Sequence, residues 1–161
     1  DPANGKFANF SPPTGKDGLC LKQISPDTVT TVSTCGAGQT QLVLYDLVAK
    51  KGTQVAMVPD QGQAGSVMYS PNGQSIAYAV ARGDPEKEVG KLVVMPSSGA
   101  PIKIIHEVSG GYINVLGWVD NERILFIRYM SDKDSIFVVN KDGSGLFKVA
   151  DGMFAGMIPV P

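Results

Sequence analysis

The sequence predicts an all-β domain made of repeated four-stranded antiparallel units. Glycine (19 residues) and proline (11 residues) interrupt the chain every few positions, which favours many short strands joined by turns. Between them lie strand-length runs rich in Val, Ile, Leu, Tyr and Phe. Because 43% of the 161 residues are hydrophobic, the chain can bury a core. Its length fits one domain, residues 1–161, or a piece of a larger one.

Two stretches of the chain align as copies of one unit. Residues 67–78 match 115–126, and the strand at 91–95 matches the strand at 135–140. Each copy reads as strand, Asn/Asp turn, strand, polar loop, strand, Gly-containing turn and strand. A recurrence of this kind indicates a repeat architecture. The predicted units are 64–108 and 112–150.

A weaker copy precedes them at residues 18–63. Residues 41–46 match the third strand of the unit, and residues 52–57 match the fourth. Two segments compete for its first turn, Ser25-Pro26-Asp27 and Ser11-Pro12-Pro13. The second choice would give this unit an insertion. Two further strands are predicted at the ends of the chain, at residues 6–10 and 153–160.

The turns have the residues that tight hairpins need. Asn72-Gly73 permits positive φ angles, and Ser70-Pro71 before it sets the entry to the turn. Asp142-Gly143-Ser144-Gly145 supplies a second hairpin. Helix signals are confined to one turn at most, around residues 86–88.

These residues carry a family resemblance. The segment 70–78 (SPNGQSIAY) and the segment 136–145 (IFVVNKDGSG) resemble the blade repeat of TolB-like, or WD-repeat-like, β-propellers. The likeness covers residues 64–150 well and 18–63 loosely. The third unit departs from it, because residues 118–122 lack the Ser-Pro and the Gly. The resemblance implies about three to four antiparallel four-stranded propeller blades.

The blade count creates a closure problem. A closed propeller typically has about four to eight blades, whereas this chain has room for about three and a half at roughly 45 residues each. The terminal strands could build a small fourth blade, two chains could associate through their blade edges, or the chain could be part of a larger six-bladed propeller. We expect self-association or a longer parent propeller, because three blades alone leave an apolar flank exposed.

The two cysteines, Cys20 and Cys35, suggest a disulfide. If residues 19–25 pair with 30–35 in one uniform register, Ile24 faces Thr31, Lys22 faces Ser33, and the cysteines face one another. Opposed residues of an antiparallel pair are close enough for a disulfide. Two ordinary buried thiols remain the alternative. A disulfide would indicate an oxidising compartment.

Charge and hydropathy exclude several classes of partner. Lys and Arg number 14 against 15 Asp and Glu, a net charge of -1, which gives no support for nucleic-acid binding. No apolar run approaches the roughly 18 residues of a membrane span, so membrane insertion is not expected. With the resemblance, these features predict an extracytoplasmic protein, periplasmic or secreted.

The sequence predicts no catalytic residues, no metal site and no cofactor. His106 is the one histidine, and we interpret it as a charge partner of Glu107 or as a hydrogen-bonding group at a blade end. No Gly-x-Ser-x-Gly nucleophile motif is present. Residues 140–151 resemble a calcium loop faintly, but a hairpin turn explains them more simply. Trp118 is expected to fill the core position that matches Tyr69.

The polar loop between the second and third strands of the unit 64–108 is the candidate binding element. Its predicted contact residues are Arg82, Asp84, Glu86, Lys87 and Glu88. The Arg-Gly-Asp tripeptide within it is a weak motif, since common tripeptides occur by chance. A binding loop held by rigid strands is a frequent arrangement.

The sequence therefore predicts a non-enzymatic scaffold that binds a protein or peptide, the partner class that the TolB resemblance implies. Two alternatives remain open. The chain could be the propeller portion of a prolyl-oligopeptidase-like hydrolase, or a sensor or lipoprotein domain.

Overall fold

A computed structural model describes residues 21–27, 30–33, 41–46, 48–49, 51–57, 63–82 and 88–156. Within these ranges the chain forms three antiparallel sheets of four strands each and no helix. The strands are β1 (Leu21–Ile24), β2 (Thr30–Ser33), β3 (Gln41–Asp46), β4 (Lys51–Met57), β5 (Gln63–Tyr69), β6 (Ser75–Arg82), β7 (Val89–Pro96), β8 (Lys103–Ser109), β9 (Gly111–Trp118), β10 (Arg123–Met130), β11 (Ser135–Asn140) and β12 (Phe147–Asp151).

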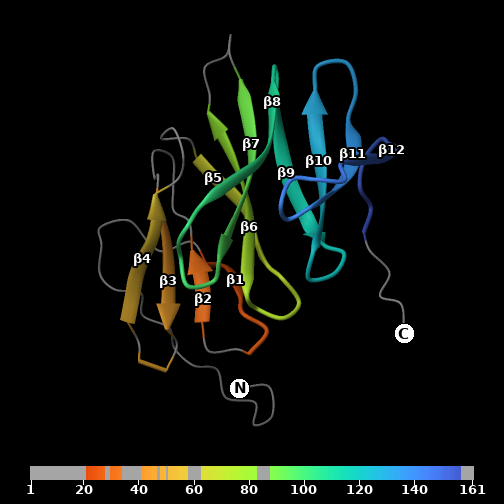
Figure 1. Ribbon diagram of the computed structural model, residues 1–161. Helices are drawn as coiled ribbons and strands as arrows, with labels where there is room; N and C mark the ends of the chain where they lie inside the picture. The colour runs from red at the N-terminus through yellow and green to blue at the C-terminus, as the bar shows by residue number, and fades with distance from the viewer. Residues whose placement is uncertain are drawn as a thin grey trace.

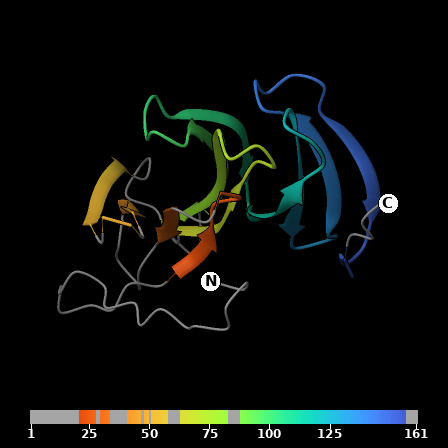
Figure 2. The same cartoon turned by 90° about the horizontal axis from the view of Figure 1, so that it is seen from below.

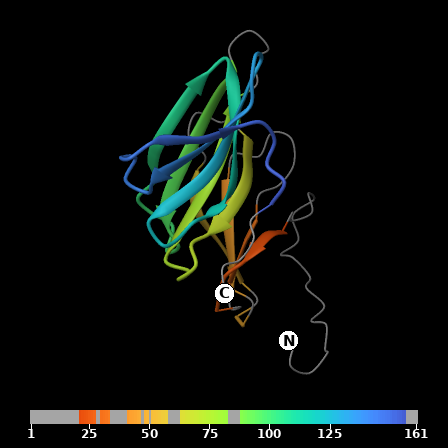
Figure 3. The ribbon, with the colours of Figure 1, turned by 90° about the vertical axis from the view of Figure 1, so that its right-hand side faces the viewer.

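Each sheet is a meander in which consecutive strands pair. The first strands of the sheets lie innermost, since β1 contacts β5 and β5 contacts β9. The three sheets fan out around this shared axis, as Figures 1 and 2 show. Seen from the side of the third sheet, the outermost strand β12 runs across the direction of the inner strands (Figure 3), as the twist of antiparallel sheets requires. The predicted fold class, all-β with antiparallel four-stranded sheets, is confirmed.

Matching Ser-Pro turns connect the first two strands of the first two sheets. Ser25 and Ser70 are both buried, with 5% and 0% exposure. The Ser25 hydroxyl donates to Asp27 Oδ1 at 2.5 Å, and the Ser70 hydroxyl donates to Asn72 Oδ1 at 2.8 Å. Of the two candidate turns for the first sheet, the structure therefore selects Ser25-Pro26-Asp27; the competitor at residues 11–13 lies outside the described residues.

The third sheet replaces this turn with an aspartate. The Asp120 carboxylate Oδ1 accepts the backbone N–H groups of Glu122 and Arg123 at 2.9 and 2.8 Å. An Asp side chain can thus organise a turn that has neither the Pro of the other two turns nor the Gly of the second one. The turns of the second and third sheets also touch, because the Asn72 backbone N–H donates to Asn121 Oδ1 at 3.0 Å.

Two apolar layers hold the sheets together, because alternate residues of each strand point to opposite faces. The layer between the first and second sheets contains Leu42, Val67, Tyr69, Ile76, Tyr78, Val80, Val93 and Met95. The layer between the second and third sheets contains Ala77, Ala79, Leu92, Val94, Ile105, Ile113, Val115, Trp118, Ile124, Phe126 and Val139. On the outer face of the third sheet, Phe154 packs against Leu125, Ile127, Ile136 and Val138.

The register of the first hairpin differs from the predicted one. Ile24 pairs with Thr31 as expected, but a bulge in β1 places Leu21, in place of Lys22, opposite Ser33. The extra residue of a bulge shifts every pair beyond it by one position. The uniform register predicted for this hairpin is therefore wrong.

The predicted disulfide between Cys20 and Cys35 depends on that uniform register. Both cysteines lie outside the described residues. Their pairing stays a prediction, and the bulge removes its geometric support.

Neither of the two predicted terminal strands is confirmed. Residues 6–10 lie outside the described part of the chain. Residues 153–156 follow β12 without strand pairing, so the predicted strand at 153–160 is not formed over its described part. Gly152 has a φ of +113°, which departs from the extended backbone that a strand needs. In the described ranges, no helix has the length and hydropathy to cross a membrane.

Candidate functional site

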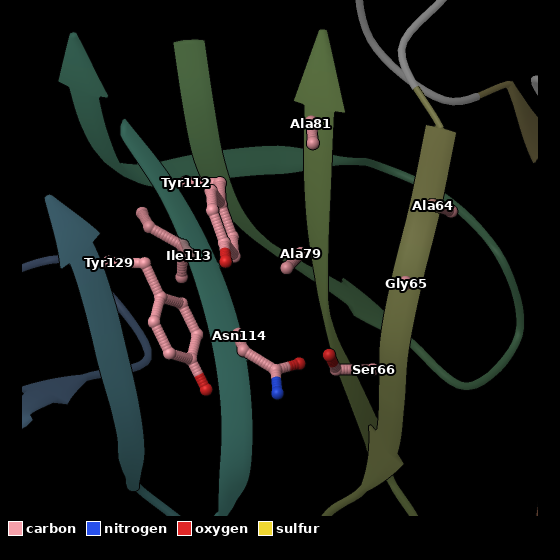
Figure 4. Close-up of a pocket in the computed structure, with 9 residues that line it drawn as sticks. All are labelled: Ala64, Gly65, Ser66, Ala79, Ala81, Tyr112, Ile113, Asn114 and Tyr129. Carbon is pink, nitrogen blue, oxygen red and sulfur yellow. The ribbon is translucent and has the colours of Figure 1, made fainter. Parts of the chain in front are cut away.

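The first two strands of the second sheet and the first two strands of the third sheet border an open pocket of about 460 Å³, the axial pocket. Its lining comes from β5 and β6 on one side and from β9 and β10 on the other, and consists of Ala64, Gly65, Ser66, Ala79, Ala81, Tyr112, Ile113, Asn114 and Tyr129. Figure 4 shows the Ser66 and Asn114 side chains pointing toward one another across this space.

On the side of the second sheet, the pocket has room because the lining residues are small (Ala64, Gly65, Ser66, Ala79 and Ala81) and because β5 contains a bulge. β5 bulges between Gly65, which pairs with Ala79, and Met68. Within the bulge Ser66 has a φ of +41°, a left-handed conformation that costs a non-glycine residue roughly 1–2 kcal/mol. Regular pairing on both sides holds the strained residue in place. The bulge thereby gives the Ser66 hydroxyl its direction toward Asn114.

Two tyrosines form the side of the pocket that belongs to the third sheet. Tyr112 on β9 and Tyr129 on β10 are cross-strand partners whose rings stack, with centroids 4.6 Å apart. Gly90 makes room for β9, because a Cβ atom at Gly90 would lie 2.7 Å from the Cα atom of Tyr112. At Gly111 a Cβ atom would lie 2.3 Å from the backbone oxygen of Tyr129. The absence of side chains at these glycines therefore sets the position of the tyrosine pair.

The lining offers aromatic faces and uncharged polar groups. Its polar side chains are the phenols of Tyr112 and Tyr129, the Asn114 carboxamide and the Ser66 hydroxyl. Among the residues that the structure describes, no carboxylate, imidazole, amine or thiol belongs to the lining of this pocket. Such a surface can bind a polar chain by stacking and by hydrogen bonds.

A second polar cluster lies between the second and third sheets. Arg128 on β10 donates from Nη2 to Nε2 of His106 on β8, at 2.5 Å. The guanidinium carbon of Arg128 lies 4.0 Å from the centroid of the Phe137 ring, and the His106 ring lies 5.4 Å from that of Phe126. Burial, together with the nearby Arg128 charge, lowers the pKa of His106 to about 4. The imidazole is thus neutral at pH 7 and accepts a hydrogen bond.

This arrangement decides between the two interpretations of His106. Glu107 pairs with Lys91, with Nζ and Oε2 3.5 Å apart, and its side chain belongs to the opposite face of β8. The predicted charge pair between His106 and Glu107 is therefore wrong. The predicted hydrogen-bonding role of His106 is confirmed, and its partner is Arg128.

The structure describes the candidate binding loop only at its ends. β6 ends at Arg82 and β7 begins at Val89. Glu88 is exposed, and its carbonyl accepts the Gly110 N–H at 2.8 Å. Asp84, Glu86 and Lys87 lie outside the described residues, as does the side chain of Arg82.

Two other sequence interpretations concern the third sheet. Asp142 Oδ1 accepts the backbone N–H and the hydroxyl of Ser144, at 2.8 and 2.6 Å, within the β11–β12 turn. The turn interpretation of this segment is confirmed. Trp118 is 7% exposed and Tyr69 is 5% exposed, and both belong to the core as predicted.

Sequence reasoning missed the residues that line the pocket. A predicted strand does not show which of its residues line a pocket, and this applies to Tyr112, Asn114 and Tyr129. The one local signal was the pair of glycines before Tyr112, which indicates a close backbone approach. Arg128 was also missed, because its partners His106 and Phe137 come from two other strands, β8 and β11.

No protein-family model matches the sequence. No curated protein matches it either.

Solved structures show where the fold recurs. The chain is similar to an oligogalacturonate lyase in complex with manganese, with a TM-score of 0.68 and 16% identity over 85% of this chain and 41% of that chain. For TolB from Acinetobacter baumannii the TM-score is 0.65 and the identity 14%, over 84% of this chain and 33% of that chain. For the β-propeller domain of the Trilobed protease from Pyrococcus furiosus the TM-score is 0.57 and the identity 15%, over 89% of this chain and 45% of that chain.

These similarities confirm the resemblance to TolB-like propeller repeats at the level of the fold. The chain spans less than half the length of each of these three chains. They include enzymes as well as TolB, so the fold leaves the activity open.

Proposed function

We propose that this chain is a propeller segment that binds a protein or peptide at the axial pocket and performs no catalysis. The observation that carries the proposal is the lining of the pocket: stacked tyrosines beside uncharged hydrogen-bonding groups. Tyrosine supplies a large, rigid contact surface at low entropic cost, which suits peptide recognition.

The predicted loop contact fits the same surface. Ala81, just before the loop, lines the pocket, and Gly90, just after it, packs against the β9 backbone at Tyr112. A ligand in the pocket would therefore lie beside the base of the loop. We propose that Glu88 and its loop neighbours extend the contact surface around the pocket.

A peptide selection tests the proposal. The immobilised chain is panned against a random-peptide phage library, and the affinities of the selected peptides are measured by fluorescence polarisation. Tyr112→Ala and Asn114→Ala should each weaken binding about fivefold to a hundredfold, as anchor residues do. Val119→Ala, an exposed residue outside the pocket lining, serves as the control. Undiminished binding by both pocket variants would refute the proposal.

Mass spectrometry of the same peptides after incubation tests the non-enzymatic part. Intact peptides are expected, and cleaved or modified ones would contradict it. The hydrolase alternative has only the fold in its support: a prolyl endopeptidase is similar with a TM-score of 0.64 at 10% identity, and the chain covers 22% of it. A hydrolase domain elsewhere in a longer parent chain would support that alternative.

We also propose an extracytoplasmic location, which the TolB resemblance implies. Fractionation of the native source, with a periplasmic or secreted marker as the reference, tests it. Recovery with the cytoplasmic marker would contradict it.

A further inference from the structure

Arg128 is a partly buried cation at the junction of the second and third sheets. One of its N–H groups bonds to His106, and its guanidinium lies over the ring of Phe137. A guanidinium has five N–H donors in a planar fork. In the described residues, neither Nε, which is buried, nor Nη1 has a hydrogen-bond acceptor.

The carboxylate in line with Arg128 is already engaged. Arg128 pairs with Ser135, and Ser135 pairs with Asp151, so the three residues lie in one row across β10, β11 and β12. Asp151, however, accepts the Ser135 hydroxyl at 2.7 Å and forms ion pairs with Lys133 and Lys148. It therefore does not neutralise Arg128.

The carboxylate next to His106 is engaged as well. Glu107 pairs with Lys91 across β7 and β8, with Nζ and Oε2 3.5 Å apart. His106 carries no charge at neutral pH and cannot balance Arg128. In the described part of the chain, the charge of Arg128 has no counter-ion.

We propose that Arg128, with His106 beside it, forms a binding site for an oxyanion, a carboxylate or phosphate group presented by a ligand. An unpaired, partly buried charge is costly, and an anion in contact with it removes that cost. Stacking on Phe137 and the bond to His106 hold the guanidinium in one orientation. With Nε buried and one N–H of Nη2 given to His106, the N–H groups of Nη1 and the second N–H of Nη2 remain to donate to an oxyanion.

The site is separate from the axial pocket, so it stands or falls independently of the proposed peptide binding. None of its residues lines that pocket. An anion on Arg128 would also act on His106. Because the positive charge of Arg128 helps to lower the pKa of His106, neutralising that charge should raise this pKa.

NMR spectroscopy tests the proposal directly. The chain has one histidine, so its imidazole Cε1–H signal reports on this site alone. Sodium acetate and inorganic phosphate are titrated separately, each against sodium chloride at equal ionic strength and fixed pH. We expect a saturable shift with at least one oxyanion and a higher pKa of His106 at saturation. Stronger binding of acetate would point to a carboxylate ligand, and stronger binding of phosphate to a phosphorylated one.

Matched variants assign the response to Arg128. Arg128→Met keeps apolar contact with Phe137 and should abolish the shift. Arg128→Lys keeps the charge without the fork and should weaken binding roughly tenfold. Arg123→Gln, at the other arginine of β10, removes an ion pair with Asp120 and should leave the response unchanged. The proposal is overturned by the absence of a saturable oxyanion shift, by the same shift in Arg128→Met, or by undiminished affinity in folded Arg128→Lys.

Discussion

The indole Nε1 of Trp118 donates a hydrogen bond to the carbonyl oxygen of Met68, 3.1 Å away. The bond joins the last residue of β9 to the inner strand of the preceding sheet. Trp118 also packs into the apolar layer between these two sheets. One side chain therefore links two blades both through packing and through a directed bond.

Replacing this side chain should loosen the junction. Trp118→Phe removes the hydrogen bond, worth about 1 kcal/mol, and part of the buried area. We expect the free energy of unfolding to fall by about 1–3 kcal/mol in total. Urea denaturation followed by circular dichroism measures this, since the variant lacks the chain's one tryptophan. The exposed neighbour Val119, changed to Ala, should cost little; equal losses in both variants would contradict the prediction.

Removing the hydroxyl group of Tyr78, unlike removing the indole of Trp118, should not lower the free energy of unfolding. Its side chain is fully buried between the first and second sheets, and its hydroxyl has no hydrogen-bond partner in the described residues. Burial raises the pKa of this phenol. Because an unpartnered buried hydroxyl costs free energy, Tyr78→Phe should leave stability unchanged or raise it by about 1 kcal/mol. If urea denaturation shows that Tyr78→Phe lowers the free energy of unfolding by more than about 1 kcal/mol, the hydroxyl has a partner.

Two glycines near the pocket should respond differently to one added methyl group. At Gly90 the new Cβ would lie 2.7 Å from the backbone of Tyr112, so Gly90→Ala should cost about 1–3 kcal/mol. At Gly65, which lines the pocket, a Cβ would meet nothing within 4 Å. Gly65→Ala is thus the matched control, and comparable melting temperatures for the two variants would refute the packing argument.

The neutral His106 predicts a pH dependence of stability. Its pKa falls from 6.5 to about 4 on folding, so between these values the unfolded chain binds the additional proton. Above pH 6.5 His106 is neutral in both states and does not make the free energy of unfolding depend on pH. As the pH falls from 6.5 toward 4, proton uptake by the unfolded chain lowers the free energy of unfolding. Because the imidazole is only partly buried, we expect a loss of about 1 kcal/mol after allowing for solvent screening.

Urea denaturation at several pH values, compared with His106→Gln, measures this dependence. The variant should show a flatter slope between pH 6.5 and 4. The pKa values of Asp120, Asp142 and Asp151 are also lowered, and these groups act mainly at the acidic end of the range. A slope in His106→Gln equal to that of the original chain would assign the dependence to other groups.

The sheet architecture could be predicted because its signals are local. Alternation of apolar residues in segments such as 75–80 identifies a strand and its buried face. Ser70-Pro71-Asn72-Gly73 identifies the turn that joins two strands. These signals depend on residues within one hairpin, and their recurrence made the repeat visible.

The failures occurred where one residue changes the register or where distant strands meet. The bulge in β1 has no distinctive local residue, and it displaced the predicted partner of Ser33 by one position. The bulge at Ser66 in β5 is marked only by the preceding Gly65, since a glycine within a strand often accompanies a bulge. A register error of one residue moves every later side chain to the other face.

The all-β class, the repeated four-stranded unit and the polar residues of its turns follow from the sequence, because short-range sterics and alternating burial control those features. Which side chains meet between units depends on the packing of the sheets. Arg128 and His106 lie on different sheets and 22 positions apart in the sequence, and Ser66 faces Asn114 across the axis (Figure 4). Such contacts depend on how twisted sheets pack against one another, and that geometry is a property of the whole assembly of strands.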